Sequence, residues 1–114
     1  MPAFVEILDG FTRQRGVQGG LVVSERDGIV VDAQVQLGVR ASVVAALAAS
    51  IYRKARLSAE AAGLGPVTYV ELAAAEGRLC MAGRDDLVVV LITDGRSSVG
   101  LLRTALLQAA ETLT

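Results

Sequence analysis

Two aliphatic segments joined by an Asp-Gly dipeptide constrain the fold of this chain more than any other feature. The segments cover residues 19–25 and 29–36, and Asp27-Gly28 stands between them. This arrangement is typical of a β-hairpin, because Asp and Gly both accept the positive φ angles of a tight turn. Apolar and polar residues alternate along the second segment, which indicates one buried and one solvated face. The residues expected on its buried face are Ile29, Val31, Ala33, Val35 and Leu37.

Three helices are predicted from hydrophobic spacing and helix propensity. The longest covers residues 40–62, which contain no Gly or Pro and many Ala. A shorter amphipathic helix is predicted for residues 2–15, with Gly16 as its stop signal. The last helix is expected to begin after Ser97 or Ser98, since either serine is a suitable N-terminal cap.

Three further strands are predicted between the second and the third helix, at residues 67–75, 78–82 and 87–92. Glu76-Gly77 and residues 83–86 are the turns expected between them. The element order is therefore α-β-β-α-β-β-β-α, in which the helices need a sheet to cover.

The composition favours one domain that associates with another chain. A length of 114 residues is that of a single domain, so residues 1–114 are taken as one unit. Hydrophobic residues make up 53% of the chain but aromatic residues only 4%, so the excess over an average soluble domain is aliphatic. Burying part of this aliphatic surface against another chain keeps such a protein soluble, and we therefore expect an oligomer.

Several function classes are disfavoured by residue counts. The formal net charge is −1, so no long-range positive field attracts nucleic acid. Histidine is absent, which excludes Ser-His-Asp or Cys-His catalysis and a histidine-bound zinc ion. The single cysteine, Cys80, is expected to be a small buried hydrophobic residue. We predict no catalytic, cofactor-binding or metal-binding residues.

Two local motifs have simple structural interpretations. The two acids within residues 83–86 supply too few oxygen ligands for calcium, so a β-turn is favoured there. The glycines at 16, 19 and 20 lack the Gly-Lys-Ser/Thr ending of a phosphate loop.

A cytoplasmic protein is expected from the absence of membrane and export signals. No apolar run approaches the roughly 20 residues that span a bilayer, so no membrane insertion is predicted. The first residues lack the basic and apolar regions of a secretory signal.

The element order, together with the segment from Gly20 to Ala33, resembles the roadblock/dynein light chain family. That segment reads GLVVSERDGIVVDA, and the family's first hairpin has a similar run of Gly, aliphatic residues, a polar turn ending in Asp-Gly, and aliphatic residues again. The resemblance implies an α/β (α+β) sandwich with a five-stranded antiparallel sheet of order 2-1-5-4-3. Helices 1 and 3 would cover one face of the sheet, and helix 2 would cover the other.

The resemblance also implies a homodimer in which the third strands pair and the second helices lie side by side. Isologous strand pairing would remove an unpaired sheet edge, and small helix residues would allow the helices a close approach. The candidate dimer-interface residues are Ala45, Ala49, Tyr52, Val67, Tyr69 and Glu71.

The function that the resemblance implies is regulation of Ras-like GTPases without an active site of its own. An effect on GTP hydrolysis would come from reshaping the switch loops of the GTPase. Arg53, Lys54 and Arg56 are the candidate partner-binding residues on the long helix, although such a cluster is also typical of a solvated helix face. One alternative is a purely structural dimerisation or scaffold subunit, and another is a ligand-sensing domain.

Overall fold

The structure is a computed structural model that describes residues 2–96 and 98–113. Its elements follow the predicted order. They are α1 (Pro2–Thr12), β1 (Val17–Ser24), β2 (Val30–Val35), α2 (Ala41–Ala61), β3 (Val70–Ala74), β4 (Gly77–Arg84), β5 (Leu87–Thr93) and α3 (Val99–Glu111).

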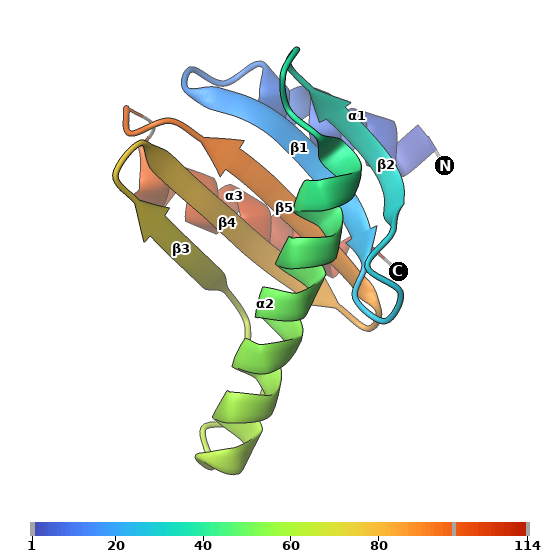
Figure 1. Cartoon of the computed structure of the whole chain (residues 1–114), viewed down its shortest axis with the longest axis vertical. Helices are drawn as coiled ribbons and strands as arrows, with labels where there is room; N and C mark the ends of the chain where they lie inside the picture. The colour runs from blue at the N-terminus through green and yellow to red at the C-terminus, as the bar shows by residue number, and fades with distance from the viewer. Residues whose placement is uncertain (1, 97, 114) are drawn as a thin grey trace.

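The five strands form one antiparallel sheet in the order β2-β1-β5-β4-β3 (Figure 1). The predicted strand order is therefore confirmed. β5 is central and buried, as expected for its unbroken aliphatic sequence. β2 and β3 are the two edges of the sheet.

Each face of the sheet carries its own hydrophobic core. The core beneath α1 and α3 contains Leu8, Leu106 and the β5 residue Leu91, all fully buried. The core beneath α2 contains Ala48 and the β5 residue Val90, also fully buried. Neighbouring residues of β5 enter opposite cores because side chains alternate along a strand. The predicted distribution of helices, with α1 and α3 on one face and α2 on the other, is confirmed.

The loop between β1 and β2 differs from the predicted tight turn. Only Gly28 has a positive φ, of 67°, while Asp27 keeps an ordinary negative value. The backbone N–H of Gly28 donates to the carbonyl of Ser24 at 2.8 Å, and the N–H of Ser24 donates to the carbonyl of Ile29 at 3.0 Å. The connection is thus a longer loop that needs one left-handed residue, which glycine adopts without steric cost.

A register shift in β2 corrects the expected buried face. Val22 faces Asp32 and Val23 faces Val30, so Val31 is the extra residue of a β-bulge. The bulge reverses the alternation, and Val30 packs on the α2 core while Val31 is 45% exposed. Ile29 and Leu37 are also exposed, whereas Ala33 and Val35 pack on the core as expected.

The two turns of the β3–β4–β5 meander also lie away from the predicted positions. Ala74 pairs with Gly77, so the first turn is formed by residues 75 and 76, and Gly77 belongs to β4. β4 continues through residue 83 to Arg84, and Asp85 takes the positive φ of 56° in the second turn. A short polar side chain tolerates this conformation better than most residues.

Three element ends also differ from the expected ones. α1 ends at Thr12, where the hydroxyl donates to the carbonyl of Leu8 at 2.9 Å, and not at residue 15. β3 begins at Val70, three residues later than predicted. Ser98 precedes α3 without a capping side-chain hydrogen bond, and Ser97 lies outside the described residues.

The C-terminal half of α2 projects beyond the sheet (Figure 1). The fully covered residues of this helix end at Tyr52, which is 4% exposed. The part of α2 from residue 53 to Ala61, here called the free half of α2, contains no buried residue. Within the described residues, no helix is long and apolar enough to cross a membrane.

Candidate partner-binding surface

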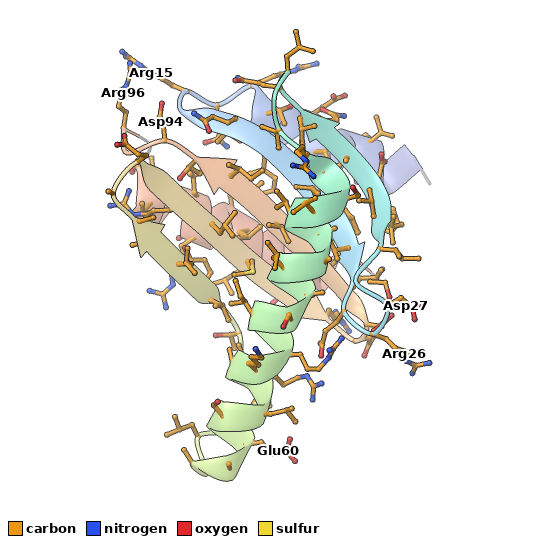
Figure 2. The ribbon with its side chains drawn as sticks, viewed as in Figure 1. Arg15, Arg26, Asp27, Glu60, Asp94 and Arg96 are labelled. Atoms are coloured by element: carbon orange, nitrogen blue, oxygen red, sulfur yellow. The ribbon has the colours of Figure 1, made fainter. Side chains whose placement is uncertain are left out.

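The free half of α2 presents aliphatic and charged side chains to solvent. Leu57 is 51% exposed, and Leu64, just beyond the helix, is 76% exposed. Lys54 is exposed on the same stretch, and Figure 2 shows Glu60 near the end of the projecting helix. The surface therefore offers both apolar area and charge to another protein.

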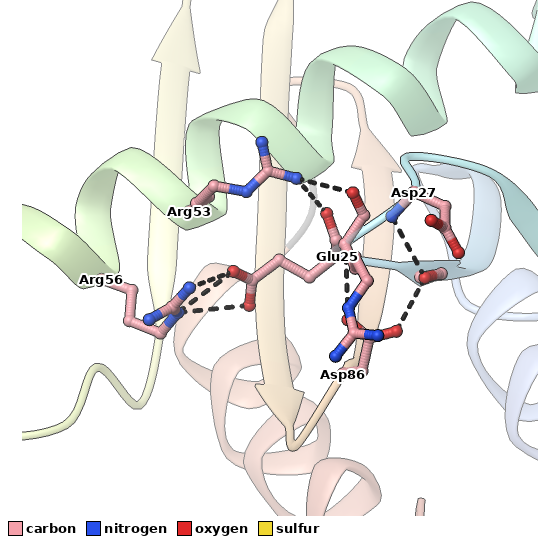
Figure 3. A network of polar contacts seen from close by, with 7 residues as sticks. Glu25, Asp27, Arg53, Arg56 and Asp86 are labelled. Atoms are coloured by element: carbon pink, nitrogen blue, oxygen red, sulfur yellow. Dashed lines mark hydrogen bonds and ion pairs between the residues drawn. The ribbon is translucent and has the colours of Figure 1, made fainter.

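Two of the three predicted partner-binding residues are bonded within the chain. The Nε and Nη2 atoms of Arg56 donate to the carboxylate of Glu25, with the shortest distance, 2.6 Å, between Nη2 and Oε1. Arg53 donates through Nη2 to the backbone carbonyls of Glu25 and Arg26 (Figure 3). Lys54 lies between them in sequence and stays exposed.

Glu25 is the centre of this network, although nothing in its local sequence indicates such a role. It follows directly after β1 and is only 5% exposed. A buried carboxylate is costly unless it is paired with a cation and hydrogen-bonded, and Arg56 supplies both interactions. The bonds to Glu25 also raise the pKa of Arg56, since they favour the charged guanidinium.

Asp86 holds the same loop from the β4–β5 turn. Its Oδ2 accepts a hydrogen bond from the Ser24 hydroxyl at 2.7 Å, and its Oδ1 accepts one from the Arg26 N–H at 2.8 Å. The Ser24 bond and then the Arg26 bond lower the pKa of Asp86, because both favour the carboxylate. Together with Glu25 and the arginines, this residue lines a polar cleft of about 620 Å³.

Three of the predicted dimer-interface side chains are buried in the hydrophobic core of the chain itself. Ala45, Ala49 and Tyr52 are 0%, 1% and 4% exposed and pack against the sheet. In a single copy these three side chains therefore present almost no surface, and their place in a dimer interface stays a prediction. Which side of an amphipathic helix is covered depends on where the helix crosses the sheet.

The other three predicted interface residues lie at or near the β3 edge. Val67 and Tyr69 are half-buried, while Glu71 is exposed. The Tyr69 hydroxyl donates to Oε1 of Glu71 at 2.9 Å, and Arg103 lies 5.3 Å from the centre of the Tyr69 ring. Burial is the main cause of the raised pKa of Tyr69.

An apolar strip beside α2 was missed by sequence reasoning. Leu72 pairs with Leu79 across β3 and β4, on the face that α2 occupies. α2 itself packs over β1, β2 and β5, so Leu72 remains 41% exposed (Figure 1). The alternation in residues 67–75 could have indicated an apolar side, but not which helix covers it.

Cys80 has the predicted role of a buried hydrophobic residue. Its side chain is fully buried in the core beneath α1 and α3, and burial raises the pKa of the thiol. Within residues 2–96 and 98–113 no group of three or more acidic or cysteine side chains is arranged to hold a metal ion.

Most of the chain matches one known protein family. Residues 3–93 match the family model of the Roadblock/LC7 domain. This chain belongs to the Roadblock/LC7 domain family.

Three similar proteins match nearly the full length of this chain. An uncharacterized protein, MJ1340 of Methanocaldococcus jannaschii, is 28% identical over 105 residues, which cover 92% of this chain and 91% of that protein. The Roadblock/LC7 domain structure from Streptomyces avermitilis has a TM-score of 0.84 at 16% identity, covering 95% of this chain and 92% of that one. The structure of Myxococcus xanthus MglB has a TM-score of 0.87 at 22% identity. The match covers 99% of this chain and 86% of that one. These structures share the fold of this Roadblock/LC7 chain.

Proposed function

We propose that this chain is a homodimeric, non-catalytic regulator or adaptor that binds a small Ras-like GTPase through α2. Regulation of such GTPases is the activity that the roadblock resemblance implies, and membership of the family supports it. The observation that carries the proposal is the free half of α2, which extends beyond the sheet with Leu57 and Lys54 exposed. A helix that projects in this way offers a partner protein a convex surface of mixed character.

The homodimer is supported by the edge of the sheet and by the apolar strip beside it. β3 is an edge strand, and its backbone is suited to isologous pairing with a second β3. Leu72 and Leu79 form an apolar strip next to α2 that the second helix of a partner copy would cover. We place the dimer in the cytoplasm, which agrees with a single cysteine that is unpaired and buried.

Dimer formation is tested by Leu72→Lys, which places a charge on the apolar strip. Because Leu72 is 41% exposed, the variant is expected to fold but to have the mass of a monomer in light scattering. Val5→Lys on α1 is the matched control, since Val5 is 45% exposed on the other layer of the molecule. A wild-type protein that is monomeric at micromolar concentration would contradict the dimer.

GTPase binding is tested by co-purification with candidate Ras-like GTPases, followed by measurement of GTP turnover with and without this protein. Lys54→Glu is expected to weaken binding, whereas Arg13→Glu, at an exposed position just after α1, is expected to leave binding unchanged. A changed turnover rate supports a regulator, and binding without a rate change supports the scaffold alternative. Failure to bind any candidate GTPase would count against both forms of the proposal.

A further inference from the structure

The free half of α2 is tied to the rest of the molecule by a clamp of two arginines. No buried residue follows Tyr52 in this helix, so core packing does not hold the segment beyond it. Arg53 and Arg56 are placed one turn apart and both reach the loop after β1. Figure 3 shows the two side chains extending from α2 toward the same segment.

The two arginines bind different parts of that loop. Arg56 donates two N–H groups to the Glu25 carboxylate. The distance to Oε1 is 3.1 Å from Nε and 2.6 Å from Nη2. Arg53 binds backbone carbonyl groups, with 3.1 Å between its Nη2 and the oxygen of Arg26. A forked contact to a carboxylate fixes direction as well as distance, because the guanidinium is planar.

The loop that receives the arginines is itself held in place by the β4–β5 turn. The N–H of Glu25 donates to the carbonyl oxygen of Asp86 at 2.8 Å, and the Asp86 carboxylate accepts bonds from Ser24 and Arg26. The clamp therefore connects α2 to two strand connections that are distant in sequence. A fixed loop is required if the arginines are to hold the helix in one direction.

We infer that Glu25 is a positioning residue that sets the direction of the free half of α2 for partner binding, and this rests on the proposed function. The helix continues for about 13 Å beyond Tyr52 at the usual rise per residue. A small tilt at Arg56 therefore displaces Leu57 and the residues that follow it. Protein interfaces are packed as closely as protein interiors, so such a displacement weakens binding.

Glu25→Gln tests the clamp without a large change in side-chain volume. Asp27→Asn is the matched control, because it removes an exposed carboxylate from the same loop. Figure 2 shows Asp27 beside Arg26 in this loop. Hydrogen exchange is measured on the amides of residues 56–61 and, for comparison, on those of 45–52. Loss of a charge-assisted contact is expected to speed exchange in residues 56–61 roughly tenfold and to leave residues 45–52 unchanged.

The conservative variant Arg56→Lys separates positioning from simple charge. Lysine keeps the positive charge but cannot make the forked contact. The amide exchange rate of residues 56–61 in this variant is therefore expected to lie between those of the wild type and of Arg56→Gln. Glu25→Gln is also expected to weaken binding of a GTPase that the wild type binds, by roughly tenfold, while Asp27→Asn binds normally.

The outcomes distinguish failure of the clamp from failure of the proposed function. Equal exchange in Glu25→Gln and Asp27→Asn, or a uniform increase along all of α2, overturns the clamp. A looser helix end with unchanged GTPase affinity overturns its role in binding. If the wild type binds no Ras-like GTPase, the proposed function fails, and the exchange of residues 56–61 still decides whether Glu25 holds the helix.

Discussion

The Nη2 atom of Arg56 lies 2.6 Å from Oε1 of Glu25, and the two residues are 31 positions apart in the chain. The side chain of Glu25 is 6% exposed and that of Arg56 is 44% exposed, so one partner is buried and the other is partly in water. Replacing Arg56 leaves a buried carboxylate without its cation, whereas replacing Glu25 leaves a cation that water solvates. The two sides of this ion pair are therefore not equivalent.

We predict that Arg56→Gln destabilises the fold more than Glu25→Gln does. In the double variant both charges are absent, so its loss is expected to be smaller than the sum of the two single losses. The four proteins should therefore show coupling between the two sites, which independent sites do not show. Urea unfolding of the four proteins measures this coupling. Additive losses would mean that the contact contributes nothing beyond the separate side chains.

Gly77→Ala is expected to destabilise the sheet. A Cβ atom at this position would lie 2.2 Å from the carbonyl oxygen of Thr93 in the neighbouring strand, so the backbone of β4 or β5 must move. Overpacking of this kind costs about 2–3 kcal/mol. Urea unfolding at neutral pH measures the loss, and a variant as stable as the wild type would show that the two strands are farther apart.

Gly10→Ala is expected to have the opposite effect. Gly10 lies inside α1, and a Cβ atom there meets nothing within 4 Å. Alanine lowers the conformational entropy of the unfolded chain and favours the helix, so stability should rise by about 0.5–1 kcal/mol. The same unfolding measurement applies, and a loss of stability would indicate that another chain or segment packs at this position.

The pH dependence of stability in acid is expected to depend on Asp86. Its pKa is lowered in the folded protein, first by the hydrogen bond from Ser24, so folding favours the carboxylate. This contribution is complete above the unfolded pKa of roughly 3.9 and is lost as the pH falls through the lower folded value. Asp86→Asn should therefore reduce the slope of stability against pH below about pH 4. An unchanged slope in thermal unfolding would contradict this role.

The two tyrosines, Tyr52 and Tyr69, are expected to stay protonated in the folded protein above pH 10. Burial is the main cause of the raised pKa of both phenols. Folding favours the neutral form, so this stabilisation is complete below the unfolded pKa of about 10 and decreases as the pH rises above it. Ultraviolet absorbance of phenolate should increase together with the loss of circular dichroism. Ionisation of both residues near pH 10 in the folded state would show that they are solvated.

The Asp27-Gly28 dipeptide shows what a local sequence pattern can and cannot predict. It located the first hairpin correctly, because an Asp-Gly pair between two aliphatic segments is a strong short-range hairpin signal. The predicted conformation of the loop was wrong, because contacts of Ser24 and Arg26 with Asp86, about 60 positions away, determine the path of the loop. A dipeptide pattern carries no information about such distant partners.

The predicted interface and partner-binding residues show the same limit. Ala45, Ala49 and Tyr52 are predicted interface residues, and in the structure they pack against the sheet of their own chain. Arg53 and Arg56 were identified as a basic cluster, but their bonds to the loop of Glu25 depend on where α2 crosses the sheet.

By itself, the sequence determined the number, type and order of the elements, the hairpin after α1 and the burial of Cys80. These features follow from local hydrophobic period and from Gly, Pro and Ala content, which act within a few residues. The tertiary structure alone decided that Val31 forms a bulge, that Leu72 remains exposed beside α2 and that Glu25 is buried under Arg56. Each of these depends on contacts between segments that are distant in the chain, and such contacts are set only when helices and sheet pack together.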